Sequence, residues 1–346
     1  MNGNFPEHPA HVENFLHELN QAAVAASDEF FAYRTPVDFR LERRRVEKFS
    51  TGDDRGEQDR RFLETTDKEA EFLRFTSPAR TPYAENNLAN ARWFPPSRSR
   101  AKRGRDGDPG RCGRRAVVVL PQWNADALSH NALCRGLQWA GIASLRLSMP
   151  YHDIRMPKEL QRADYAVSAN LGRTLDAARQ AVVDIRSCLD WLQQRGYTRL
   201  GIMGTSLGSC YAFLASAHDA RLEVNAFNHA STYFADVVWT GQSTRHIRTA
   251  IEGAIGLDSL RRAWLAISPA SYFEHFARWP KKSLVVYSKY DLTFLPEFSR
   301  QVLEGFRRRG LEHEVAVLPC GHYTCEKLPF NYLDGYYLAR FLAREM

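Results

Sequence analysis

The sequence predicts an α/β protein whose mostly parallel sheet of eight strands carries helices on both faces. Short apolar segments of strand length alternate with segments of helical periodicity over most of the chain, as in proteins with parallel sheets. One such strand is followed by a glycine-flanked serine, and two later strands are followed by an aspartate and a histidine. The 346 residues are 44% hydrophobic and 12% aromatic, which is enough to bury a large core.

The first part of the chain, residues 1–69, is predicted to be a helical and charged extension of a main domain that spans 70–346. Apolar residues recur at helical spacing within 11–33, and we expect this segment to pack on the main domain, with contact to lipid as the alternative. Residues 38–68 are charged and show no periodicity, so no element is assigned to them.

Strand-length segments continue through the main domain. The segments 71–75 and 87–94 are predicted to form an antiparallel pair at the edge of the sheet. Six further segments are predicted to be strands, and the first of them is a continuous apolar run, as expected for a strand that is covered on both faces. They are residues 115–120, 142–147, 200–203, 223–227, 283–287 and 314–318.

Helices are predicted between these strands. The clearest one precedes the strand at 200–203, because its apolar residues step by four and three positions, and Gly196 stands where a helix-ending glycine is expected. Other helices are predicted at 131–141, at 207–217 and at the end of the chain, 330–346.

The serine lies in Gly204-Thr205-Ser206-Leu207-Gly208, which fits the G-x-S-x-G pattern of a strand, a sharp turn and a helix. A serine on so sharp a turn has strained backbone angles, and side chains at the two glycine positions would crowd the neighbouring strand or helix. Its place at a helix N-terminus points backbone N–H groups at the atom that it would attack. We therefore predict that Ser206 is a nucleophile.

A serine hydroxyl needs a base, and the base works best when a carboxylate orients it. Asp291 follows the strand at 283–287, and His322 follows the last strand, so both are expected at the same sheet edge as Ser206. Asp236 is kept as the alternative acid. His229 also follows a strand and is expected to line the pocket or to cap a turn.

Two backbone N–H groups are predicted to hold the negative charge that develops on the substrate oxygen. One is that of Leu207, and the other comes from the loop after the strand at 115–120, where Trp123 is the expected donor. Each such donor is worth roughly 10²–10³-fold in rate.

With these residues in place, the region from about 70 to 346 resembles the α/β-hydrolase superfamily. The resemblance rests on the serine motif, on Asp291 and on Gly321-His322 in their strand contexts. The run Pro150-Tyr151-x-x-x-Arg155-x-Pro157, taken with the elbow, is similar to the branch named for α/β-hydrolase domain-containing protein 18. The superfamily implies a hydrolase without cofactor that acts on esters, thioesters, amides or lipids, and the branch implies an acylated or lipid-like substrate. Many relatives carry His-Gly where this chain has Pro121-Gln122, which leaves the second oxyanion donor open.

Two segments are expected to shape the substrate pocket. Tyr151 and Arg155 follow the strand at 142–147 and are predicted, with His229, to bind substrate; Arg155 would pair either with an anionic substrate group or with a residue of its own chain. Residues 231–280 are helical in character and rich in aromatic side chains, so they are predicted to form an inserted lid. Those aromatic residues are expected in the core more than in the pocket wall.

The net charge of +7 comes mostly from one loop, residues 97–115, which holds eight basic and two acidic residues. This loop is predicted to be a solvated surface insertion, with contact to an anionic membrane as the alternative, and nucleic acid binding is disfavoured. No apolar run is long enough to span a membrane, no secretory signal precedes the domain and the six cysteines are scattered, so a cytoplasmic location without a metal site is expected.

The sequence therefore predicts a serine hydrolase that cleaves a carboxylic ester of a small-molecule or lipid-like acyl substrate, including a thioester, through an acyl-enzyme. Transfer of the acyl group to an acceptor other than water would use the same residues. A binding protein that has this fold without catalysis is the alternative from another class.

Overall fold

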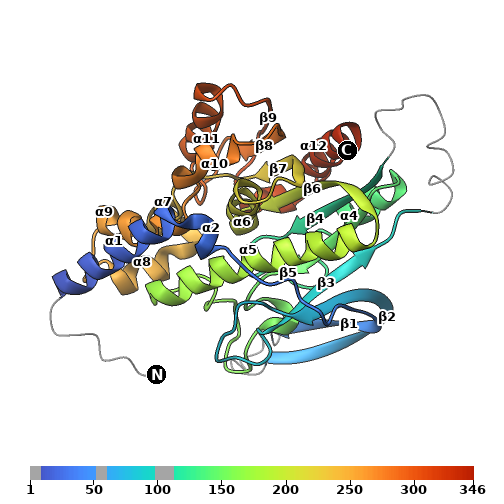
Figure 1. Cartoon of the computed structure of the whole chain (residues 1–346), viewed down its shortest axis with the longest axis horizontal. Coiled ribbons are helices and arrows are strands. Elements are labelled where there is room, and N and C mark those ends of the chain that lie inside the picture. Colours follow the sequence, from blue (N-terminus) through green and yellow to red (C-terminus); the bar gives the residue numbers. More distant parts are fainter. Residues whose placement is uncertain (1–8, 52–60, 98–112) are drawn as a thin grey trace.

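The computed structural model describes residues 9–51, 61–97 and 113–346, and it has the predicted α/β architecture (Figure 1). One sheet of nine strands has the order β1-β2-β3-β5-β4-β6-β7-β8-β9. The strands are β1 Arg40–Thr51, β2 Arg61–Thr76, β3 Leu88–Phe94, β4 Arg114–Leu120, β5 Ala143–Ser148, β6 Tyr197–Thr205, β7 Leu222–Asn228, β8 Lys282–Ser288 and β9 His313–Leu318.

The sheet is parallel from β5 to β9 and antiparallel at its other end. β4 pairs in parallel with β5 and β6, and the parallel pairing continues through β7, β8 and β9. β3 runs antiparallel to both β5 and β2, and β1 runs antiparallel to β2. The predicted antiparallel pair of 71–75 and 87–94 is thus present, but a further strand lies outside it.

That further strand, β1, corrects the predicted count of eight strands to nine. Its composition is charged because it lies at the sheet edge, where Arg43 pairs with Glu69 and Arg74 of β2 pairs with Glu42 across the ladder at 2.8 and 3.4 Å. Only Val46 is buried among its described side chains, so the strand has no apolar periodicity to detect. The predicted boundary at residue 69/70 falls within β2.

Helices cover both faces of the sheet. They are α1 Pro9–Ala25, α2 Ser27–Phe30, α4 Asn131–Trp139, α5 Leu171–Gln194, α6 Leu207–Ala217, α7 Phe234–Thr240, α8 Arg245–Ile251, α9 Leu257–Ala263, α10 Phe273–Phe276, α11 Pro296–Arg308 and α12 Phe330–Glu345. Short 3₁₀ turns include η4 Leu265–Ile267 and η6 Tyr323–Glu326. The expected glycine after α5, Gly196, has a φ of +78°.

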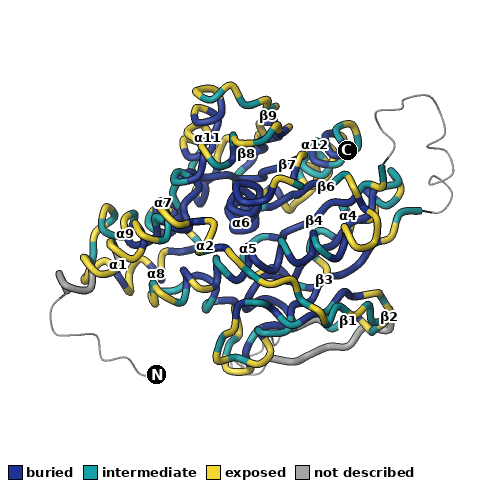
Figure 2. The backbone as a smooth tube through the Cα atoms, viewed as in Figure 1, coloured by how far each residue is buried: buried dark blue, intermediate teal, exposed yellow. Residues whose placement is uncertain are grey.

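Alternate residues of β4 show how the two layers of the core are divided. Val117 and Val119 pack in one apolar cluster with residues of α4 and α12. Val118 and Leu120 pack in a second cluster with residues of α5 and α6. This period of two places buried side chains on both faces of the central strands, whose backbone is dark blue through the middle of the molecule in Figure 2.

The N-terminal helices lie against the helices of residues 231–280 (Figure 1). α1 contacts α9 and η4, and the buried Asn20 accepts a hydrogen bond of 3.0 Å from the backbone N–H of Ala266. None of the helices among residues 9–51, 61–97 and 113–346 combines the length and apolarity that a membrane crossing requires. Most of the predicted basic loop, residues 98–112, lies outside the described residues.

Candidate active site

Ser206 occupies a strained turn between β6 and α6. Its φ and ψ are 56° and −118°, which a residue with a side chain rarely adopts. The turn is held from both sides, because the Ser206 backbone N–H donates to the carbonyl oxygen of Asn228 at 2.8 Å and its carbonyl oxygen accepts from the N–H of Ser209 at 2.9 Å. The side chain is 6% exposed.

The two glycines of the motif permit close backbone contacts around this turn. A Cβ atom at Gly204 would overlap the carbonyl oxygen of Gly208. A Cβ atom at Gly208 would lie 2.6 Å from the carbonyl oxygens of Leu120 and Pro121, at the end of β4. Because those contacts involve backbone rather than mobile side chains, α6 could not stay as close to the sheet with any other residue at these positions.

Asp291 and His322 meet through a direct hydrogen bond. Nδ1 of His322 lies 2.8 Å from Oδ2 of Asp291, and Oδ1 of the same carboxylate accepts the backbone N–H groups of Thr293 and Phe294, each at 2.8 Å. A carboxylate only accepts when it is ionised, so Nδ1 of His322 carries the hydrogen, and in the neutral ring the lone pair is on Nε2. The Phe294 ring stacks on His322 with 5.7 Å between ring centroids.

His229 is a second imidazole beside the same carboxylate. Its Nδ1 lies 3.0 Å from Oδ2 of Asp291, at an angle that does not make a hydrogen bond, and its ring centroid is 4.8 Å from that of His322. The His229 backbone has a φ of 58°, and its N–H donates to the carbonyl oxygen of Val286 at 2.8 Å. His229 thus lines the cavity, and its imidazole lies beside Asp291.

The surroundings keep Asp291 ionised. Burial by itself would raise the pKa of this carboxyl, but the two imidazoles beside it, His322 through its hydrogen bond and His229 at 3.0 Å, outweigh burial and hold the pKa far below its usual range. Burial lowers the pKa of His229, which favours its neutral form. One ligand atom of each of these three residues lies within 4.8 Å of the others, so they could also hold a metal ion. His322 already donates to Asp291, and an imidazole held by a carboxylate in this way can act as a base.

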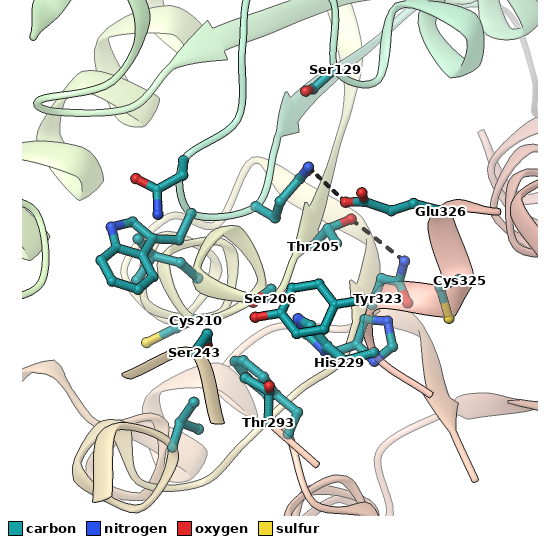
Figure 3. A pocket seen from close by; sticks show the side chains of 18 of the residues that line it. Ser129, Thr205, Ser206, Cys210, His229, Ser243, Thr293, Tyr323, Cys325 and Glu326 are labelled. Carbon is teal, nitrogen blue, oxygen red and sulfur yellow. Dashed lines mark hydrogen bonds between the residues drawn. The ribbon is translucent and has the colours of Figure 1, made fainter. Parts of the chain in front are cut away.

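Ser206, His229 and His322 line one cavity of about 660 Å³ at the carboxyl ends of the parallel strands. In Figure 3, Ser206 lies near the centre, between Thr205 and Glu326 on one side and Cys210, Ser243 and Thr293 on the other. Within the described residues, no hydrogen bond joins Oγ of Ser206 to His322. The structure thus brings the predicted nucleophile and base to one cavity without a hydrogen bond between them.

Both predicted oxyanion donors border the cavity. Leu207 is the first residue of α6, and Trp123 follows β4. Among the residues that the structure describes, neither backbone N–H has an acceptor. The Trp123 indole is itself held, because its Nε1 donates to the carbonyl oxygen of Ala163 at 3.0 Å and its ring stacks on His246.

Tyr151 and Arg155, which were predicted to bind substrate, do not reach the cavity. Arg155 is 0% exposed and pairs with the equally buried Asp184 at 2.8 Å, while its Nη1 donates to the carbonyl oxygen of Ser148 at 2.9 Å. Tyr151 is 2% exposed and packs in the core with Tyr83 and another tyrosine. The run that contains both residues therefore has a structural role, because it anchors the loop after β5.

The alternative acid, Asp236, and the predicted lid, residues 231–280, both lie in the segment of helices after β7. Asp236 is buried in α7 and its carboxylate pairs with Arg261 at 2.6 Å, whereas the carboxylate that binds His322 is that of Asp291. Residues 231–280 are largely helical, and Phe234, Val237 and Val238 of this segment line the cavity. Most of its aromatic residues are in the core, as expected, and Trp264 is 0% exposed.

A polar chain on the cavity wall was not predicted. Oδ2 of Asp334, in α12, accepts from Nδ2 of Asn228 at 2.9 Å, and the same Nδ2 lies 3.5 Å from Oγ1 of Thr205. Thr205 also lies 2.9 Å from Nε2 of His130, whose φ is 65°. The signal available in the sequence was weak, since only Thr205, Asn228 and their positions at strand ends marked this wall.

Comparisons with known proteins agree with the fold. Residues 126–278 match the family model described as alpha/beta hydrolase domain containing 18. The acetyl xylan esterase 1 of a Thermoanaerobacterium species is 12% identical, with a TM-score of 0.59 over 94% of this chain and 93% of that one. The acetyl xylan esterase of a Paenibacillus species is 13% identical, with a TM-score of 0.57 and the same coverage.

A puromycin-hydrolyzing peptidase of Mycobacterium tuberculosis is 12% identical, with a TM-score of 0.56 over 80% of this chain. This chain covers only 44% of the length of that peptidase. No curated protein sequence matches the chain significantly. At these identities the solved structures establish a shared fold, and the predicted α/β-hydrolase fold is confirmed.

Proposed function

We propose that this chain, which has the α/β-hydrolase fold, is a serine hydrolase that cleaves carboxylic esters through Ser206, His322 and Asp291. One observation carries the proposal. Ser206 is held on a strained turn in the same cavity as an imidazole whose Nδ1 is bound to a buried carboxylate. Strain of this kind is retained where the surrounding structure enforces it, and it is concentrated at reactive sites.

Attack on the ester begins with proton transfer. His322 Nε2 takes the hydrogen of Ser206 Oγ while Oγ forms a bond to the carbonyl carbon, and Asp291 stabilises the imidazolium that results. This step requires the Ser206 side chain or the His322 loop to move so that Oγ and Nε2 form a hydrogen bond. Contacts of this type often become short only when substrate is bound.

The remaining steps use the two backbone donors and water. The N–H groups of Leu207 and Trp123 stabilise the oxyanion of the tetrahedral intermediate. The intermediate collapses when His322 donates its proton to the alcohol oxygen and the bond between carbon and that oxygen breaks. Water then attacks the acyl-enzyme, His322 accepts the water proton, and the bond to Ser206 Oγ breaks as the proton returns to the serine.

The cavity walls support an acyl substrate of modest size. Phe234, Val237 and Val238 supply apolar surface from the 231–280 segment, and Phe294 adds a ring beside His322. A volume of about 660 Å³ lies within the range of small-molecule sites. Apolar side chains bind an acyl chain by excluding water from both surfaces.

A fluorophosphonate probe tests for the activated serine. Wild type should be labelled, Ser206→Ala should not, and His322→Gln should be labelled at least 100-fold more slowly because the base is missing. Ser209→Ala is the matched control, since this buried hydroxyl lies one turn away and donates to the Ser206 carbonyl oxygen at 2.7 Å. Labelling that survives in Ser206→Ala would overturn the proposal.

A panel of p-nitrophenyl esters and matched p-nitroanilides then identifies the bond that is cleaved. We expect kcat/KM to rise with acyl length until the apolar wall is filled, and then to fall. Anilide cleavage at rates comparable to those for esters would show a peptidase instead.

A further inference from the structure

Two imidazoles and a carboxylate meet where the N-terminal helices contact the main domain, away from the catalytic residues. They belong to Asp28 in α2, His218 at the C-terminal end of α6, and His275 in α10. One ligand atom from each lies within 4.8 Å of the other two. Phe31 lies beside them, with its ring centroid 4.6 Å from that of His218.

His218 has a defined tautomer and a buried lone pair. Its Nδ1 lies 2.8 Å from the carbonyl oxygen of Leu214, and because a carbonyl only accepts, Nδ1 carries the hydrogen. Burial lowers the pKa of His218 to about 4, so the ring is neutral at pH 7 and Nε2 has a lone pair. The residue is 6% exposed, and within the described residues Nε2 has no hydrogen-bond partner. Histidines that bind metals commonly donate their other N–H to a backbone carbonyl in this way.

His275 and Asp28 complete the cluster. Nδ1 of His275 is buried and also lacks a partner among the described residues, while its Nε2 lies 3.2 Å from Oγ of Ser27. The Asp28 carboxylate is exposed and lies 3.4 Å from Nη1 of Arg278, which is itself partly exposed. Since exposed ion pairs of this kind contribute little, Asp28 is free to turn toward the imidazoles.

We propose that Asp28, His218 and His275 bind a zinc ion, with water as the fourth ligand. Zinc takes imidazole nitrogen and carboxylate oxygen at about 2.0–2.2 Å, which places tetrahedral ligands about 3.3 Å apart. The three side chains therefore need to approach one another by at most about 1.5 Å. Magnesium and calcium prefer sites of oxygen ligands only, so two nitrogen donors favour zinc.

A buried nitrogen usually has a hydrogen-bond partner, but a water molecule has no room to bond to the unpartnered nitrogens of His218 and His275. The unpartnered atoms of His218 and His275 have almost no accessible surface. A metal ion can sit closer to them than a water molecule, because its bonds to nitrogen are about 2.0–2.1 Å long. Such an ion would join α2 to α6 and α10, and it would stabilise the contact of the N-terminal helices seen in Figure 1.

The test is metal binding by the full chain after treatment with EDTA. Because His229, Asp291 and His322 could hold a second ion, binding is measured in a His322→Gln background. Titration with Co²⁺ should give the visible absorption of a tetrahedral site, and Zn²⁺ should displace it with a dissociation constant on the order of 1 µM or tighter. At 100 µM Zn²⁺ the Tm should rise by about 3 °C.

Asp28→Asn and His275→Gln should each weaken zinc binding at least tenfold, whereas Glu29→Gln, a neighbouring exposed carboxylate outside the cluster, should leave it unchanged. Labelling of Ser206 in a chain with intact His322 should be unaffected by Asp28→Asn, so the zinc site and the hydrolase proposal fail independently. Asp28 is exposed, and its variant is therefore expected to fold even if His275→Gln does not. Binding that is absent in the His322→Gln chain, or equal in Asp28→Asn and Glu29→Gln, would overturn the proposal.

Discussion

Replacing Asp334 by Asn should make the protein more stable at alkaline pH. This carboxyl lies on the cavity wall, and burial raises its pKa from 3.8 to about 7, while the hydrogen bond from Asn228 offsets only part of the effect. Its Oδ1 has no partner among the described residues. An asparagine of the same shape can still accept from Asn228 and has no charge to bury.

The direction follows from proton linkage. The folded pKa lies above the unfolded one, so between about pH 4 and pH 7 the folded protein holds a proton that the unfolded chain has released. Wild type therefore loses stability relative to Asp334→Asn as the pH rises through this window. If the group were fully shielded from water, a pKa raised to about 7 would lower the unfolding free energy of the wild type by about 4 kcal/mol at alkaline pH. Because Asp334 is partly exposed, screening by solvent reduces this loss of unfolding free energy. We expect the wild type to lose about 2 kcal/mol relative to Asp334→Asn between pH 5 and pH 8.

The assay is urea unfolding of wild type and Asp334→Asn at pH 5 and pH 8. The difference in the free energy of unfolding between the two proteins should favour the variant by about 2 kcal/mol more at pH 8 than at pH 5. Asp258→Asn serves as the control, because that carboxylate is 80% exposed and should show no such change. The same difference at both pH values would mean that Asp334 ionises normally, and the burial argument would fail.

Three further substitutions test the contacts described above. Gly208→Ala puts a Cβ 2.6 Å from two backbone oxygens, so it should lower the unfolding free energy by about 3 kcal/mol and slow probe labelling. Gly253→Ala is the control, because a Cβ there meets open space and should have no effect. Equal effects of the two substitutions would refute the steric argument. Arg155→Met leaves the buried Asp184 carboxylate without its counter-charge, so the variant should lose roughly 3–5 kcal/mol of unfolding free energy. KM should change equally for neutral and anionic esters, and a selective rise of KM for anionic esters would assign Arg155 to the substrate site. His229→Gln removes one of the two imidazoles beside the buried carboxylate and should lower kcat about tenfold, which is about 1.4 kcal/mol of activation free energy. A change in KM alone would assign His229 to substrate binding.

Much of the fold was predictable because buried parallel strands are apolar on both faces. All eight predicted strands are present, and the turn at Ser206 was identified because its glycines satisfy a local steric requirement. β1 was missed for the opposite reason. Its charged residues are stabilised by cross-strand pairs with β2, and a window of sequence does not contain the partner strand.

The candidate site was also predicted in part. The order of Ser206, Asp291 and His322 along the chain, each after a parallel strand, was sufficient to predict that they meet at one sheet edge. From the sequence, Arg155 could bind either a substrate or a residue of its own chain. Only the tertiary structure showed that its partner is Asp184 in α5.

By itself, then, the sequence determined the strands, the serine turn and the order of the three predicted catalytic residues, because each depends on local periodicity, local sterics or chain direction. The tertiary structure decided the contacts between distant segments: His229 beside Asp291, Asp334 beside Asn228, and Asp28 near His218 and His275. Such contacts depend on which surfaces face each other after folding, and side-chain type records that a group is polar without recording its partner.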